Sequence, residues 1–186
     1  DIMKNKLVLL LLAFFSLSAF KTDRVITVFM IGDSTMANKT IEGGNLERGW
    51  GHVLAGFFSE DIRVDNHAQN GRSSKSFIDE GRWEKVISQV KKGDYVFIQF
   101  GHNDEKPDSA RHTDPGTTFD ANLRRFVNET RAKGGIPVLF NSIVRRNFIR
   151  PQDKEMNNDA RKEPGKESVA VEGNTLFDTH GSYLDS

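Results

Sequence analysis

Residues 25–34 read Val-Ile-Thr-Val-Phe-Met-Ile-Gly-Asp-Ser, and the interpretation of the whole chain begins from this stretch. Its apolar and β-branched run stops at Gly32. Because the run is short and apolar on both faces, it predicts a buried strand of a parallel sheet. Gly32 allows a sharp turn at the carboxyl end of that strand. In open α/β sheets, this end is where ligands bind.

Ser34 follows directly after this turn. A serine hydroxyl at the carboxyl end of a strand is well sited to act as a nucleophile. The same place also suits a helix N-cap, which is a common role for an Asp or Ser that follows a strand. This stretch alone leaves both interpretations open.

Apolar segments with the pattern of strands alternate with amphipathic segments along the chain. The expected strands cover residues 25–31, 62–66, 95–100 and 136–140, and apolar side chains at helical spacing predict helices within residues 50–58, 83–90 and 119–130. Such alternation implies an α/β fold with a parallel sheet and right-handed crossovers. Residues 38–48 and 67–74 are expected to be loops. Residues 145–173 are charged and irregular, which predicts a long surface insertion, with residues 169–171 as a short strand in it.

The beginning of the chain has the composition of an export signal. Lys4 and Lys6 precede an apolar run from Leu7 to Phe15, and small residues follow as far as Ala19. That run is too short for a membrane span. We therefore expect residues 1–19 to be a signal peptide and residues 20–186 to form a secreted or periplasmic domain, with no membrane contact after cleavage.

Composition narrows the class of partner. The chain of 186 residues has 26 Lys and Arg against 26 Asp and Glu, and it has no cysteine. This balance argues against nucleic acid or an anionic membrane as a partner, and zinc sites built on cysteine are excluded. No Gly-x-Gly-x-x-Gly follows the first strand, and no histidines and carboxylates gather at metal-ligand spacing. We expect neither a cofactor nor a metal, and oligomeric state cannot be read from the sequence.

Polar clusters stand at the carboxyl ends of the first three expected strands, at residues 32–34, 70–74 and 101–104. Because these ends share one edge of a doubly wound sheet, the hydroxyl of Ser34, the backbone amide of Gly71 and the side-chain amide of Asn103 should lie at that edge. They are the groups needed to attack an ester and to stabilise the resulting oxyanion. Taken singly, Gly71 could be a turn glycine and Asn103 a helix cap; their order favours the catalytic interpretation.

These clusters resemble the sequence blocks of SGNH, or GDSL-type, hydrolases. More narrowly, residues 31–35, 70–74, 100–104 and 145–148 are similar to those of rhamnogalacturonan acetylesterases, and the resemblance covers roughly residues 26–186. It implies a flavodoxin-like, doubly wound parallel sheet and an acetylated polysaccharide or oligosaccharide as substrate. It also implies Ser34 as nucleophile, with an oxyanion hole formed by the backbone amides of Ser34 and Gly71 and the side chain of Asn103.

The family's fourth block, Asp-x-x-His, has no counterpart here. In the family its histidine is the general base and its aspartate orients the ring. The chain has five histidines, none with an aspartate three residues before it: His52, His67, His102, His112 and His180. A fifth strand and a closing helix, implied after Leu176, are also missing. We therefore expect the base to lie beyond Ser186.

Three alternatives remain open. His180 is the first substitute for the base, because Asp178 stands two residues before it. For His102, a substrate-side or structural role is favoured over that of a base. The chain could also be a non-catalytic, carbohydrate-binding remnant of the same fold. Its large aromatic side chains could stack on sugar rings, although core packing is favoured for each: Trp50, Phe77 and Trp83.

Overall fold

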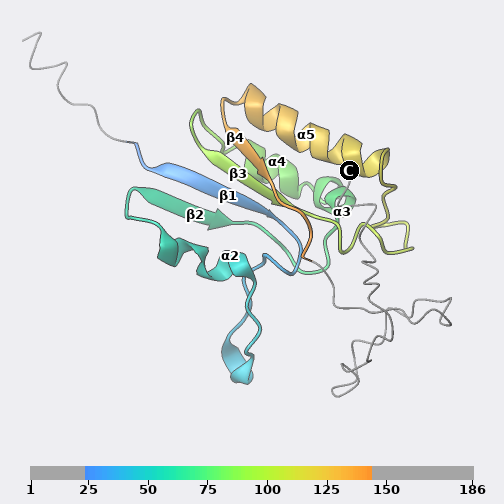
Figure 1. The fold of residues 1–186 in the computed structure, drawn as a ribbon, viewed down its shortest axis with the longest axis horizontal. Coiled ribbons are helices and arrows are strands. Elements are labelled where there is room, and N and C mark those ends of the chain that lie inside the picture. Colours follow the sequence, from blue (N-terminus) through green and yellow to red (C-terminus); the bar gives the residue numbers. More distant parts are fainter. Residues whose placement is uncertain (1–23, 144–186) are drawn as a thin grey trace, which may run out of the picture.

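The computed structural model describes residues 24–143, and four parallel strands form its sheet. The strands are β1 (Ile26–Gly32), β2 (Ile62–Asn66), β3 (Tyr95–Gln99) and β4 (Ile136–Leu139). They lie in the order β2-β1-β3-β4 (Figure 1). The predicted α/β class and parallel sheet are therefore confirmed, and each strand begins or ends within about one residue of the expected range.

The strand order places a topological switch point at the centre of the sheet. From β1 the chain moves outward to β2, and it then returns past β1 to form β3 and β4. β1 pairs with both β2 and β3, so its carboxyl end lies between theirs. In open α/β sheets ligands bind at this reversal. The loops after β1, β2 and β3 are thus the ones to inspect for a site.

Helices cover both faces of the sheet. Figure 1 shows α3 (Ser74–Asp79), α4 (Arg82–Ile87) and α5 (Thr118–Ala132) on one face, and α2 (Trp50–Val53) on the other. Side chains of β1 alternate between the two faces. Phe29 and Ile31 pack in the core under α3, α4 and α5, whereas Val28 and Met30 pack in a smaller core with residues of α2.

Aromatic rings fill the larger core. Trp83 and Phe126 meet edge to face with their centroids 4.9 Å apart, and Phe77 meets Phe100 at 5.5 Å. The side chains of Phe77 and Trp83 are fully buried. Core packing, rather than stacking on sugar rings, is therefore confirmed for these two residues.

The structure corrects the sequence prediction at two helices. α3 begins inside the polar stretch that was expected to end a loop at Ser74. The Ser73 hydroxyl accepts the N–H of Ser76 at 3.1 Å, and the Ser76 hydroxyl accepts the N–H of Ser73 at 2.9 Å. This is a capping box with serine in place of the usual Glu or Gln, so the usual signal was missing. The helix expected within residues 50–58 is α2 followed by a 3₁₀ turn, η2 (Leu54–Phe57).

Several predictions fall outside residues 24–143. These are the signal peptide (1–19), the surface insertion (145–173) with its short strand (169–171), the absent strand and helix after Leu176, and the environment of His180. Between β1 and α2 the predicted loop is present, with one 3₁₀ turn, η1 (Glu42–Gly44), which projects away from the sheet (Figure 1). Within the described part of the chain, no helix has the length and apolarity that crossing a membrane requires.

Candidate active site

The turn that carries Ser34 begins where β1 touches β3. A Cβ atom on Gly32 would lie 2.6 Å from the backbone oxygen of Gln99, its partner in the sheet register. Gly32 does not have a positive φ. Glycine is needed for close approach of the two strands rather than for an unusual backbone angle.

The side chain of Asp33 stabilises the turn that carries Ser34. Its buried carboxylate accepts the backbone N–H and the hydroxyl of Thr35, both at 2.8 Å. This is the Asx-turn pattern, in which an aspartate bonds the backbone two residues ahead. Residues 34–36 form a turn and no helix begins at Ser34, so the N-cap alternative is wrong for this stretch. Ser34 is half-buried, and no described residue forms a hydrogen bond with its hydroxyl.

Gly71 lies in a tight turn after β2. Its φ of +76° and the bond from Arg72 N to Gln69 O at 3.3 Å define a type II turn, since no non-glycine residue in the described range has a positive φ. A Cβ on Gly71 would meet nothing within 4 Å. Here the backbone conformation, not space, requires glycine. The Gly71 N–H has no acceptor among the described residues, so it can donate to a ligand.

The side chain of Asn103 connects the loop after β3 to the loop after β2. It is buried, and its Nδ2 donates to the backbone oxygen of Arg72 at 3.0 Å. A primary amide has two N–H groups, so this contact uses one of them. The contact orients the amide beside the residue that follows Gly71. The helix-cap alternative does not apply to Asn103, because its amide contacts no helix end.

Asp104 interacts with the start of a helix, α3, that lies 30 residues earlier in the chain. Its carboxylate accepts the Ser74 N–H at 3.0 Å, the Ser74 hydroxyl at 2.5 Å, the Gly101 N–H at 3.1 Å and the Thr113 hydroxyl at 3.0 Å. Ser74 is the first residue of α3, where a carboxylate also interacts well with the helix dipole. Burial nevertheless raises the pKa of Asp104 to about 6, against the opposite effect of these hydrogen bonds.

His102 lies between two of the loops. Its Nε2 is 2.6 Å from the backbone oxygen of Ile143, and its Nδ1 is 4.0 Å from the Asp33 carboxylate. These contacts agree with a structural role. Two other histidines sit beside nearby aspartates, His67 near Asp65 at 3.1 Å and His112 near Asp114 at 3.2 Å. Among residues 24–143, no histidine stands in the Asp-x-x-His arrangement of the expected base.

One residue at the site was missed by the sequence analysis. Lys39 Nζ donates to Asn70 Oδ1 at 2.8 Å, and the Lys39 side chain is only 7% exposed. A partly dehydrated cation thus lies next to the residue before Gly71. Lys39 stands in a polar loop 31 residues from Asn70, and no local pattern in the sequence indicates this contact.

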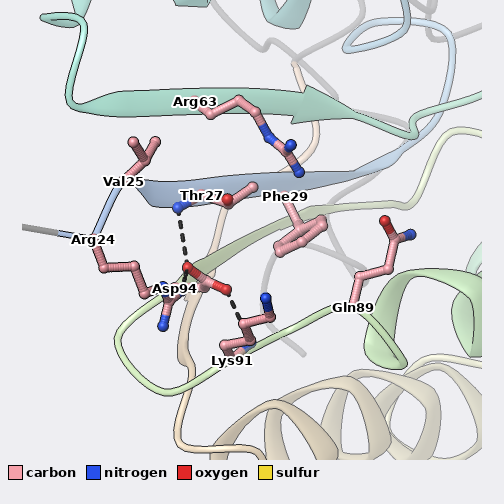
Figure 2. A pocket seen from close by; sticks show the side chains of 8 residues that line it. All are labelled: Arg24, Val25, Thr27, Phe29, Arg63, Gln89, Lys91 and Asp94. Carbon is pink, nitrogen blue, oxygen red and sulfur yellow. Dashed lines mark hydrogen bonds and ion pairs between the residues drawn. The ribbon is translucent and has the colours of Figure 1, made fainter. Parts of the chain in front are cut away.

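One cavity lies away from these loops. A cavity of about 400 Å³ opens at the amino ends of the strands, lined by Arg24, Val25, Thr27, Phe29, Arg63, Gln89, Lys91 and Asp94 (Figure 2). There the Asp94 carboxylate accepts the backbone N–H groups of Thr27 at 3.0 Å and Lys91 at 2.9 Å, and it pairs with Arg24. These contacts join the starts of β1 and β3. Because parallel strands all point the same way, this cavity is at the opposite edge from Ser34.

A second cavity, of about 510 Å³, lies between α5 and β4. Its lining includes Phe100 and Phe140 with Asn141 and Ser142, which follow β3 and β4. None of the predicted catalytic residues lines it. In the part of the chain from 24 to 143, no three His, Asp or Glu side chains come together as metal ligands would.

Comparisons with known proteins agree with these loops and this sheet. A family model described as "GDSL-like Lipase/Acylhydrolase family" matches residues 30–181. Rhamnogalacturonan acetylesterase RhgT of Bacillus subtilis is 43% identical over 123 residues, which are 66% of this chain and 51% of that protein. The rhamnogalacturonan acetylesterase of Emericella nidulans is 39% identical over 93 residues, 50% of this chain and 34% of its own length.

A solved structure gives the same fold. The crystal structure of protein YxiM from Bacillus subtilis superposes with a TM-score of 0.60 at 27% identity, over 67% of this chain and 35% of that one. The chain spans about half the length of the first two curated relatives that it matches, 51% and 54%. The resemblance inferred from the three polar clusters is confirmed, since the family model takes in all three. This chain belongs to the GDSL-like lipase/acylhydrolase family.

Proposed function

We propose that this chain carries the nucleophile and the oxyanion donors of a secreted carbohydrate esterase that removes acetyl groups from rhamnogalacturonan, a pectin-type polysaccharide. The observation that carries the proposal is the meeting of three loops at the switch point of the sheet. The Ser34 hydroxyl follows β1, the unused Gly71 N–H follows β2, and the Asn103 amide follows β3 and bonds to Arg72. Serine esterases need these groups at one edge.

The reaction proceeds in two steps. Ser34 Oγ attacks the acetyl carbon, the carbonyl oxygen becomes an oxyanion, and the N–H groups of Ser34, Gly71 and Asn103 donate to it. A histidine base outside the described residues takes the proton from Ser34 and gives it to the departing sugar oxygen. Water then attacks the acetyl-serine, acetate leaves, and the hydroxyl of Ser34 is restored.

The substrate class is supported by the curated relatives. Two proteins named as rhamnogalacturonan acetylesterases are 43% and 39% identical to this chain over their matched segments. Acetyl esters are small, which agrees with a site formed by the loops at this edge of the sheet rather than by either of the two cavities. The balanced charge of the chain also favours a carbohydrate over a nucleic acid.

A second candidate is a carbohydrate-binding protein without turnover. The observation that favours it is the lack of an Asp-x-x-His base among residues 24–143, because Ser34 is a weak nucleophile unless a base takes its proton. In this case the three loops would bind acetylated sugar, but the protein would release no acetate.

Acetate release and binding together separate the two candidates. The full-length protein is incubated with acetylated rhamnogalacturonan, with acetylated xylan and with an aryl acetate, and binding of the first is measured by calorimetry. Acetate release that prefers rhamnogalacturonan supports the esterase. Binding of acetylated rhamnogalacturonan with no acetate release from any substrate supports the binding protein, and neither binding nor release contradicts both.

Export is part of the proposal and has its own test. Residues 1–19 have the basic start, apolar run and small residues of a signal peptide. Protein recovered from the medium or periplasm should lack Met3 and begin near Phe20, as read by mass spectrometry of its N-terminus. Exported protein with an intact Met3 would contradict the signal peptide.

A further inference from the structure

The last residue of β3 is a buried glutamine on an otherwise apolar face. Gln99 is 4% exposed and follows Tyr95 and Phe97 on the side of the sheet that α2 covers. A buried amide is unfavourable unless its polar atoms are hydrogen-bonded. Its position opposite Gly32 places it directly beneath the turn that carries Ser34.

Three separate segments of the chain form hydrogen bonds with this amide. Its Oε1 accepts the indole N–H of Trp50 at 2.7 Å and the hydroxyl of Thr35 at 3.1 Å, and its Nε2 donates to the backbone oxygen of Asn141 at 2.9 Å. Indole can only donate and a carbonyl can only accept, so the amide has one consistent orientation. Gln99 therefore joins the turn after β1, α2 and the segment after β4.

The bond to Thr35 reaches the nucleophile's turn. Thr35 is next to Ser34, and its N–H and hydroxyl also contact the Asp33 carboxylate. A hydroxyl has one hydrogen, so the Thr35 hydroxyl is shared between Asp33 and Gln99. Four residues beyond Gln99, the same chain segment carries Asn103. One side chain thus fixes both the turn of the attacking group and the base of the loop that carries an oxyanion donor.

We propose that Gln99 is a positioning residue for Ser34. Its hydrogen bonds with Thr35 and Trp50 fix the position of the turn that carries Ser34 relative to Asn103. The inference rests on the proposed esterase function for its kinetic consequence, but its structural part does not need turnover. Trp50 is itself held in place by packing, because the centroid of its ring lies 5.3 Å from that of Phe140. Its indole N–H is used by Gln99 and is not free for a sugar.

The kinetic arm uses Gln99→Met, which keeps the length of the side chain and removes all three hydrogen bonds. A displacement of about 1 Å at a nucleophile can reduce the rate about a hundredfold. We expect kcat on an aryl acetate to fall at least about tenfold with KM nearly unchanged, because the substrate contacts are kept. Thr35→Val should reproduce most of this loss, and the double variant should lose less than the product of the two single effects.

Val96→Ala is the matched control. Val96 is fully buried on the same strand but belongs to the core on the other face. It should lower stability while kcat of the folded protein stays the same. An equal fall in kcat for Val96→Ala would show that general loosening of β3 explains the effect, and it would overturn the positioning role.

The structural arm uses NMR and is independent of activity. The chain has two tryptophans, and the indole N–H of Trp83 donates to the Glu129 carboxylate at 2.6 Å, in the core on the other face of the sheet. In Gln99→Met we expect the Trp50 indole signal to shift. The Thr35 amide should exchange with solvent at least about tenfold faster, because its turn loses the hydrogen bond to Gln99. The Trp83 indole signal should not move.

The outcomes separate this inference from the proposed function. A full-length wild-type protein without Ser34-dependent acetate release would overturn the esterase, and the Thr35 amide would still decide whether Gln99 holds the turn. An unchanged Thr35 amide, or full kcat in Gln99→Met, would overturn the positioning role even in an active esterase. If Gln99→Met does not fold, Thr35→Val supplies the same two measurements with a smaller change.

Discussion

The side-chain nitrogen of Asn103 donates to the backbone oxygen of Arg72 across 3.0 Å, so the loop after β3 holds the loop after β2. Arg72 follows Gly71, whose N–H has no acceptor within the described range. One N–H of the Asn103 amide is used in this contact, and no described residue accepts the other, which can donate to an oxyanion in the proposed site. Asn103 therefore has two tasks in the proposed site: it donates a hydrogen bond and it orients a second donor.

Replacing Asn103 should damage turnover much more than binding. In Asn103→Ala both tasks are lost, and kcat on acetyl esters should fall by about a hundredfold or more, with little change in KM. The control is Asn122→Ala, because Asn122 Nδ2 donates to the Ser74 hydroxyl at 3.0 Å and has no contact with Arg72. Steady-state kinetics of the two variants decide the point. A kcat for Asn103→Ala as high as that for Asn122→Ala would leave Asn103 with a structural role alone.

A comparison of Gly71→Ala with a second glycine variant should separate the effect of backbone strain on stability from an effect on catalysis. Its φ of +76° disfavours any Cβ, so Gly71→Ala should lose about 1–2 kcal/mol of unfolding free energy and should turn the N–H away from its direction. Gly93 has a φ of +87° and equally open surroundings, but it precedes the amino end of β3. Gly93→Ala should show a similar loss in urea unfolding with unchanged kcat. If both variants keep full kcat, the Gly71 amide is not an oxyanion donor.

Gly32 offers a test of the contact between β1 and β3. Since its Cβ would lie 2.6 Å from the Gln99 backbone oxygen, Gly32→Ala must push the two strands apart or shift the Ser34 turn. Stability should fall by about 1–3 kcal/mol, as is typical of overpacking. Gly56→Ala, where nothing lies within 4 Å of the new atom, should be nearly neutral. Equal melting temperatures for the two variants would contradict the close approach at Gly32.

The main features of the fold could be predicted from the sequence because they depend on local patterns. Apolar runs that stop at glycine marked the strands, and the polar clusters after them marked the edge of the sheet. Features that depend on tertiary contact were missed. Gln99 and Thr35 are 64 residues apart in the sequence, and Lys39 and Asn70 are 31 residues apart. No local pattern therefore predicts either hydrogen bond. The capping box at Ser73 was missed because serine replaces the usual glutamate or glutamine.

Asp104 should make stability depend on pH in the direction opposite to a typical surface carboxylate. Burial raises the pKa of Asp104 from 3.8 to about 6, so between pH 4 and pH 6 the folded protein keeps a proton that the unfolded chain has lost. The free energy of unfolding therefore falls as pH rises through this window, by on the order of 3 kcal/mol for this residue. The loss is complete about one pH unit above the folded pKa. About one pH unit below the unfolded pKa both states are protonated and the contribution is constant.

Urea unfolding at pH 4, 5, 6 and 7 measures this effect as a difference between wild type and Asp104→Asn, which cannot titrate. The difference between the two should change progressively from pH 4 to pH 6 and then level off. The exposed Asp108 is a control of opposite sign, because its hydrogen bond with Arg111 lowers the pKa of Asp108. Its contribution should be present above pH 4 and lost as the pH falls. A wild-type minus Asp104→Asn difference that is flat across the window would show that Asp104 titrates normally.

The central claim is that Ser34 attacks the acetyl ester. It is tested most directly by the rate of acetate release from acetylated rhamnogalacturonan, measured in the full-length protein, which includes the proposed histidine base, for the wild type, for Ser34→Ala and for Ser88→Ala. Ser88 is an exposed serine at the end of α4 whose hydroxyl donates to the Lys85 backbone oxygen at 2.9 Å. We expect release by the wild type and by Ser88→Ala, and none above background by Ser34→Ala. Release by Ser34→Ala at the wild-type rate would contradict the claim.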